Sequence, residues 1–275
     1  MNKRKDAMMK GMTKLLVLFV IGLSLLGTNL VAQEDANAIM KKSHMTYYYA
    51  GDDGVAEVKM TLVSSSGKER EREFTMLRLD NEDGGNQMYY TYFKKPSDVA
   101  RTSFMVHKTD EGNDKRWIYV PAIDLVRPIS ADDKNSSFVG SDFSYEDVSG
   151  RHWTEDTHTM TGESELDGKA VWVIESVPKE GDDSFAKKIS YIDQETYLPL
   201  KEEYFNDKDE MTRRFSAVEI EEVDGFITMT TRKMEDLDKG SHTIVAFSSI
   251  DYNVGLDEDI FTERYLKNPP RQYTN

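Results

Sequence analysis

The 275-residue sequence contains no cysteine. Without thiols the chain forms no disulfides, and it has no cysteine that could carry a lipid anchor at a new N-terminus. The fold must therefore be held together by an apolar core. A chain of this length is long enough to build a core of that kind in one large β domain.

Positive charge is also scarce. The chain has 35 lysines and arginines against 50 aspartates and glutamates, which gives a net charge of −15. Nucleic-acid binding depends on neutralising phosphates, so we expect no nucleic-acid partner. An acidic exterior also repels anionic membrane surfaces, and it is typical of a soluble, well-solvated protein.

Long apolar runs are limited to one, residues 15–26. A membrane-spanning helix needs about 20 apolar residues, so this run is too short to span. Basic residues precede it, which is typical of a secretory signal. We predict a signal peptide at residues 1–32, cleaved after Ala32, and a single exported domain at residues 33–275. Because residues 1–32 hold five basic residues and one aspartate, cleavage would change the net charge to about −19.

Most of the remaining chain alternates between apolar and polar residues, with short turns between the alternating segments. This period-two pattern is typical of antiparallel strands joined as hairpins. The Asp167-Gly168 pair suits a two-residue type I′ turn. Twelve segments have this pattern, and a further extended piece lies at 123–129; from them we predict about ten or eleven strands. The segments are 55–63, 69–79, 88–93, 103–108, 115–120, 157–166, 169–177, 185–192, 197–205, 211–223, 226–237 and 241–252.

Helical patterns are few: 36–44, 141–148 and 257–266. Some strands are apolar on both faces; Trp172 and Ile174, for example, alternate with valines. Such strands need an apolar layer on each side. We therefore predict a mainly β (α+β) fold, in which a strongly curved antiparallel sheet forms an incomplete β-barrel and short helices lie across its concave side.

Residues 117–147 contain the most distinctive sequence motifs. A strand begins at Trp117 and is stopped by Pro121, which cannot donate to a sheet ladder. Further on, Gly140 permits a tight backbone, and Ser141 or Asp142 can cap a short helix. The patterns W-x-Y-x-P-A, V-R-x-I and S-F-x-G-S-D-F-S-Y-E-D resemble the LolA-like family of outer-membrane lipoprotein-sorting proteins, over about residues 36–266.

The resemblance implies an apolar cavity that receives acyl chains. Aromatic and methionine side chains, which are abundant here, suit flexible apolar ligands. The predicted ligand-binding residues are Phe104, Val106, Trp117, Tyr119, Phe138, Phe143 and Trp172. The predicted motif and lid residues are Pro121, Gly140, Ser141, Asp142, Tyr145 and Asp147, within a movable segment at 130–148.

Catalytic signatures are weak. In Gly140-Ser141-Asp142 the serine directly follows the glycine, which does not match a nucleophile elbow. His152 and His158 are six residues apart, too far along a strand to share a metal. We predict no enzymatic activity, no metal and no cofactor.

The resulting hypothesis is a periplasmic carrier for lipoprotein acyl chains or another lipid, which takes part in transport to the outer membrane. The resemblance implies an inner-membrane permease and an outer-membrane acceptor as partners, and we expect a monomer. The alternative is a periplasmic sensor or accessory subunit of an envelope export permease that uses the same fold for protein docking.

Overall fold

A computed structural model describes residues 36–82, 84–109, 113–179 and 184–274. The predicted signal peptide at 1–32 lies outside these residues. The described residues form 13 strands: β1 (Asp53–Val63), β2 (Glu69–Asp80), β3 (Gln87–Lys95), β4 (Ser103–His107), β5 (Lys115–Val120), β6 (Leu125–Ile129), β7 (Asp156–Leu166), β8 (Lys169–Pro178), β9 (Lys187–Asp193), β10 (Pro199–Phe205), β11 (Met211–Val223), β12 (Phe226–Asp236) and β13 (Ser241–Tyr252).

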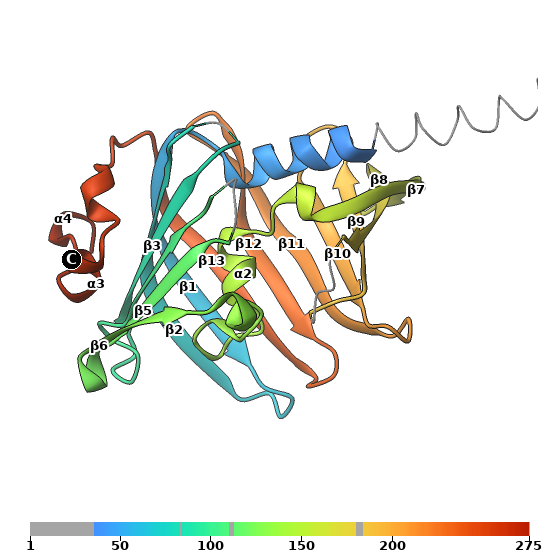
Figure 1. Cartoon of the computed structure of the whole chain (residues 1–275). Coiled ribbons are helices and arrows are strands. Elements are labelled where there is room, and N and C mark those ends of the chain that lie inside the picture. Colours follow the sequence, from blue (N-terminus) through green and yellow to red (C-terminus); the bar gives the residue numbers. More distant parts are fainter. Residues whose placement is uncertain (1–35, 83, 110–112, 180–183, 275) are drawn as a thin grey trace, which may run out of the picture.

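All 13 strands belong to one antiparallel sheet in the order β6-β5-β4-β3-β2-β1-β13-β12-β11-β10-β9-β8-β7. The chain runs outward from β1 to the edge strand β6, then crosses to the opposite edge at β7 and returns strand by strand to β13, beside β1 (Figure 1). The sheet is strongly curved and does not close, because β6 and β7 lie at opposite ends of the strand order. The predicted fold class is confirmed.

The crossing between the two edge strands is made by residues 130–155, which lie on the concave side of the sheet (Figure 1). This connection contains the short helices η2 (Ala131–Asp133), η3 (Phe138–Gly140), α2 (Tyr145–Ser149) and η4 (Trp153–Glu155). The topology therefore places the distinctive motif inside the curved sheet.

The strand count is higher than predicted, partly because the extended piece at 123–129 contains a strand. Pro121 starts a turn of 3-10 helix, η1 (Pro121–Ile123), and the chain then returns as β6 against β5. The hairpin prediction at Asp167-Gly168 is confirmed, since both residues have the positive φ that a type I′ turn requires (52° and 82°).

The two faces of the sheet have separate apolar cores. On the concave face, Val58, Met60 and Phe74 belong to a large cluster that also includes residues of the crossing segment. On the convex face, Leu77 and Tyr90 pack against the C-terminal segment. That segment contains η5 (Glu258–Ile260), α3 (Glu263–Lys267) and α4 (Arg271–Thr274), and lies outside the sheet (red in Figure 1). The predicted position of the helix at 257–266 on the concave side is therefore wrong, because its apolar residues pack on the convex face.

The first described element is a helix over residues 36–48, four residues longer at its C-terminal end than predicted. It crosses one end of the curved sheet (blue in Figure 1). Its apolar residues Ala36, Ile39 and Met40 pack in a third cluster with Ile174 and Ile192. None of the helices in the described part of the chain has the length and hydropathy needed to cross a bilayer.

Candidate functional site

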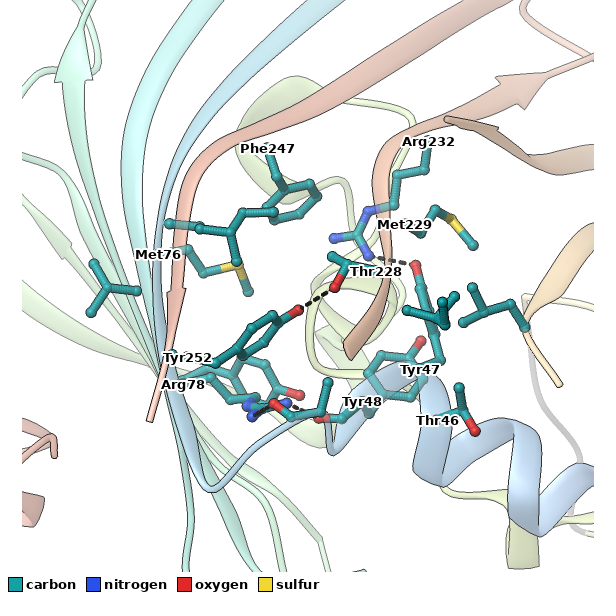
Figure 2. Close-up of a pocket in the computed structure, with 18 of the residues that line it drawn as sticks. Thr46, Tyr47, Tyr48, Met76, Arg78, Thr228, Met229, Arg232, Phe247 and Tyr252 are labelled. Carbon is teal, nitrogen blue, oxygen red and sulfur yellow. Dashed lines mark hydrogen bonds between the residues drawn. The ribbon is translucent and has the colours of Figure 1, made fainter. Parts of the chain in front are cut away.

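A cavity of about 120 Å³ lies between the concave face of the sheet and the C-terminal end of the helix at 36–48. Side chains from β1, β2, β12 and β13 form its walls, and the helix contributes Tyr47 and Tyr48 (Figure 2). The lining is mostly apolar and aromatic. It consists of Thr46, Tyr47, Tyr48, Ala50, Gly54, Val55, Ala56, Met76, Arg78, Tyr89, Val148, Leu198, Ile227, Thr228, Met229, Arg232, Phe247, Ile250 and Tyr252.

The lining includes two arginines, Arg78 and Arg232, and no acidic residue. The tyrosine hydroxyls add no negative charge at neutral pH, because burial raises the pKa of Tyr47, Tyr48 and Tyr89. Among the described residues, the only charged side chains of the cavity wall are therefore positive, although the whole chain has a net charge of −15.

Arg78, on β2, holds the end of the helix at 36–48. Its guanidinium donates to the carbonyl oxygens of Tyr48 (2.6 Å), Ala50 and Gly51 (2.7 Å). The Tyr48 oxygen also accepts from the side-chain amide of Gln87 (2.9 Å). The last carbonyls of a helix have no partners within the helix, so this arginine satisfies groups that would otherwise need water.

Arg232, on β12, points into the cavity (Figure 2). Its Nη1 donates to the hydroxyl of Tyr47 at 2.5 Å, and its guanidinium lies 4.7 Å from the ring centre of Phe247 and 5.8 Å from that of Phe143. The Nε atom is buried and has no hydrogen-bond partner among the described residues. Arg232 is thus a cation in a largely aromatic environment.

A smaller hollow of about 20 Å³ continues from the cavity toward the crossing segment. The two spaces share Met76, Val148, Arg232 and Phe247. Phe138 and Phe143 line the hollow, so these two predicted residues lie next to the cavity.

The other predicted ligand-binding residues lie elsewhere. Phe104 and Val106 are fully buried in the concave core, and the Phe104 ring packs against those of Phe138 (5.4 Å) and Tyr145 (5.1 Å). Trp172 packs against Tyr197 (5.0 Å) in the cluster beneath the helix at 36–48. None of these three residues lines the cavity.

Trp117 and Tyr119 require a correction, because they lie on the convex face. In β5 they alternate with Arg116 and Ile118, and Ile118 belongs to the concave core. Trp117 instead packs 5.1 Å from the ring of His107, within the convex cluster. The sheet therefore separates both side chains from the cavity.

The motif residues fasten the crossing segment to the sheet. The Asp142 carboxylate accepts hydrogen bonds from Ser241 (2.6 Å) and Thr243 (2.7 Å) on β13. Asp147 forms an ion pair with Arg213 on β11. The movable segment predicted at 130–148 is thus tied to two strands in this structure.

The helix cap predicted at Ser141 or Asp142 is wrong. Helix α2 begins after Ser144, whose hydroxyl accepts from the Asp147 amide (3.0 Å), while the Asp147 carboxylate accepts from the Ser144 amide (2.7 Å). Ser141 instead donates to the Phe138 carbonyl (2.7 Å), across a turn that Gly140 permits with φ of +80°. The capping box is therefore S-Y-E-D.

The predicted ligand-binding residues do not include Tyr47, Tyr48, Met76, Arg78 and Arg232. The two tyrosines and Met76 belong to the aromatic and methionine side chains that were expected to suit a flexible apolar ligand, whereas the two arginines were not expected in the site. The sequence pattern could have identified Arg78 and Arg232. Each points to the same face of its strand as a buried apolar residue, Phe74 in β2 and Met234 in β12. A charge at such a position must have an interior function or an interior partner.

A polar chamber lies beside the cavity, beneath the same helix. His44 from the helix is buried and lies 5.3 Å from the ring of His152. His158 bonds with the Ser176 hydroxyl (2.8 Å) and the Trp153 carbonyl (2.7 Å), which uses both of its ring nitrogens. Among the described residues no group of three histidines or acids could hold a metal ion.

These histidines predict that acid weakens the fold. Burial lowers the pKa of His44 well below its ordinary value and also lowers that of His158. A histidine whose folded pKa is lowered takes up a proton on unfolding, so its contribution is complete above about pH 6.5 and is lost as the pH falls toward the folded pKa. We expect the free energy of unfolding to fall between pH 7 and 5, by at most about 1.4 kcal/mol per pH unit for each histidine.

Urea denaturation at pH 7, 6 and 5 measures this slope. The double variant His44→Gln, His158→Gln should have a shallower pH dependence than the natural sequence, whatever its stability at pH 7. An unchanged slope in the double variant would contradict the assignment to these two groups.

Comparisons with known proteins agree with the architecture. The chain superimposes on a LolA superfamily protein from Nitrosomonas europaea with a TM-score of 0.65 at 16% identity, over 84% of this chain and 98% of that one. The curved, unclosed antiparallel sheet with short helices on its concave side is therefore the LolA-like fold.

Two solved structures are more similar in sequence. A DUF1329 family protein from Desulfovibrio piger shares 27% identity with a TM-score of 0.79, and a putative outer membrane lipoprotein-sorting protein domain from Vibrio parahaemolyticus shares 25% with the same TM-score. Each alignment covers 86% of this chain and 99% of the other. No curated protein matches the sequence.

A family model described as "Uncharacterized protein" matches residues 85–268, about two thirds of the chain. The protein belongs to this family. Its structural neighbours confirm the predicted resemblance to LolA-like lipoprotein-sorting proteins.

Proposed function

We propose that this protein is a periplasmic carrier that binds acyl chains of lipoproteins, or of another lipid, and takes part in their transport to the outer membrane. The observation that carries the proposal is the apolar cavity on the concave face, lined on one side by Tyr47 and Tyr48 at the end of a helix. Residues 1–32 serve as the export signal, residues 33–275 form the carrier domain, and an inner-membrane donor and an outer-membrane acceptor complete the route.

A physical need supports such a carrier. Each buried CH₂ is worth about 0.8 kcal/mol, so a 16-carbon chain costs on the order of 12 kcal/mol to expose to water. A dry cavity removes most of this cost without chemistry, and a carrier needs no catalytic residue. This is consistent with the expected absence of enzymatic activity.

The cavity takes only part of such a chain in the present state. Pockets for drug-sized ligands enclose about 300–1,000 Å³, against about 120 Å³ here. Tyr47 and Tyr48 are the side chains whose displacement would lengthen the space toward the chamber beneath the helix, which both tyrosines also line. Uptake in this proposal is therefore coupled to movement of the end of the helix.

The direct test is native mass spectrometry of the protein, expressed from its full-length sequence and purified from a periplasmic fraction. A retained lipid or acylated species at fixed stoichiometry is the expected result, and organic extraction identifies it. A ligand-free mass, together with no uptake of the neutral apolar dye N-phenyl-1-naphthylamine, would favour the docking-subunit alternative.

Filling the cavity should reduce uptake. Met76→Trp places an indole where a thioether now lines the wall, and we expect at least tenfold weaker binding of dodecanol, about 1.4 kcal/mol, in displacement of the dye. Val218→Trp is the matched control, because Val218 is exposed on β11. Equal dodecanol affinity in a folded Met76→Trp protein would place the ligand elsewhere.

A further inference from the structure

The guanidinium of Arg232 faces the cavity without an acidic partner. No carboxylate among the described residues lies within 4.0 Å of it, and its Nη1 donates to a neutral phenol, that of Tyr47. Its other close neighbours are aromatic rings, those of Phe247 and Phe143. By contrast, the nearby guanidinium of Arg213 is paired with Asp147.

An arginine side chain keeps its proton in proteins, so Arg232 remains positively charged in the cavity. Holding a cation away from water without a counter-charge is costly, and aromatic faces and one phenol compensate only in part. The second cavity arginine, Arg78, is already occupied by three carbonyl oxygens. Arg232 is therefore the cation available to a ligand.

We infer that the ligand of this cavity is an anionic amphiphile, whose carboxylate or phosphate head binds Arg232 while its chain lies along Met76, Phe247 and the hollow at Phe143. The inference rests on the proposed carrier function and narrows its ligand class. The guanidinium offers a planar set of donors that matches a carboxylate or phosphate. A chain held through a neutral ester or amide does not supply this partner.

The test compares two 12-carbon ligands that differ at the head, laurate and dodecanol, in displacement of N-phenyl-1-naphthylamine from the full-length-expressed protein. In an apolar cavity without a cation, dodecanol binds more tightly, because a carboxylate gives up far more hydration than a hydroxyl. With Arg232 available we expect laurate to bind at least tenfold more tightly than dodecanol. Dodecyl phosphate should behave like laurate.

Arg232→Met should reverse the order of the two ligands, through a loss of laurate affinity with dodecanol affinity retained. Arg70→Met removes the same charge from an exposed position on β2 and should leave the order unchanged. If the Arg232 variant does not fold, the comparison in the natural sequence still decides the point.

Each remaining outcome counts against a specific claim. Equal binding of the two ligands, or tighter binding of dodecanol, in the natural sequence overturns the anionic head while leaving the carrier function intact. Displacement by neither ligand overturns the carrier function itself. Displacement by inorganic phosphate as effective as that by dodecyl phosphate would make the ligand a free anion and overturn the amphiphile.

Discussion

Arg78→Met should destabilise the protein by about 3–5 kcal/mol, the range observed when one partner of a buried charged network is removed. The Tyr48 carbonyl would keep its bond from Gln87, but the Ala50 and Gly51 carbonyls would lose the donor that reaches them. A hydrogen bond from a charged donor contributes about 1.5–3 kcal/mol, so two such losses are sufficient for the predicted effect.

The predicted effect is also local. Arg78 joins β2 to the segment at which the helix over residues 36–48 ends, and Tyr48 in that segment lines the cavity. In the variant, amide hydrogen exchange should accelerate most in residues 45–51, with less change in the sheet. Urea denaturation gives the total loss of stability, and exchange followed by mass spectrometry locates it.

Arg70→Met is the matched control, because it removes the same side chain from an exposed position on the same strand. Exposed charges contribute little, so we expect a change below about 1 kcal/mol. Similar losses in the two variants, or an Arg78 variant with unchanged exchange at residues 45–51, would show that the guanidinium does not hold the end of the helix.

The strands could be predicted from the sequence because alternation and turn residues are local signals. Asp167-Gly168 is the clearest case, since the dipeptide alone specifies positive φ at two consecutive positions. The curvature followed from a second local fact, that strands such as β8 are apolar on both faces although few helices are present to cover them.

Which side chains of a strand face the concave side of the sheet could not be predicted in the same way. In β5, alternation separates Trp117 and Tyr119 from Ile118, but both sets are apolar, so the pattern does not tell which set faces the concave side. The answer depends on the C-terminal segment, which contacts the convex face through pairs such as His107 and Phe261, 154 residues apart. No local pattern encodes a contact of that separation.

The same reasoning explains why the cavity was only partly predicted. Phe138 and Phe143 were selected through a motif, and the fold brings them to the adjoining hollow. Tyr47 and Arg232 are 185 residues apart and meet only because β12 lies beneath the end of the first helix. Their contact is a consequence of the sheet order and not of either local sequence.

A substitution in the C-terminal segment, Phe261→Ala, should also cause a large loss of folding stability. Phe261 is almost fully buried and packs in the convex cluster with Leu77, Tyr90 and Leu266. Truncation of a buried phenylalanine to alanine typically costs 3–5 kcal/mol, through lost transfer free energy and the cavity left behind. We expect Phe261→Ala to lower the free energy of unfolding by about this amount and the melting temperature by roughly 10 °C.

The contacts around Phe261 determine which part of the variant loses stability first. Before Phe261 the segment is held by Asp53, whose carboxylate accepts from the Val254 (2.7 Å) and Leu256 (2.6 Å) amides. After Phe261 it is held by Tyr90, which donates to the Tyr265 carbonyl (2.8 Å). Loss of the Phe261 ring from between these points should expose the segment before the sheet unfolds. Limited proteolysis should therefore cut the variant first within residues 257–274.

Val254→Ala provides the control, because Val254 lies in the same segment but is 41% exposed, and we expect a change within about 0.5 kcal/mol. The cavity residues lie on the other face of the sheet, so dye uptake at low temperature should persist in Phe261→Ala. A stable Phe261 variant would mean that the convex face is apolar for a reason other than this segment. Loss of dye uptake without loss of stability would mean that the two faces are coupled through the sheet.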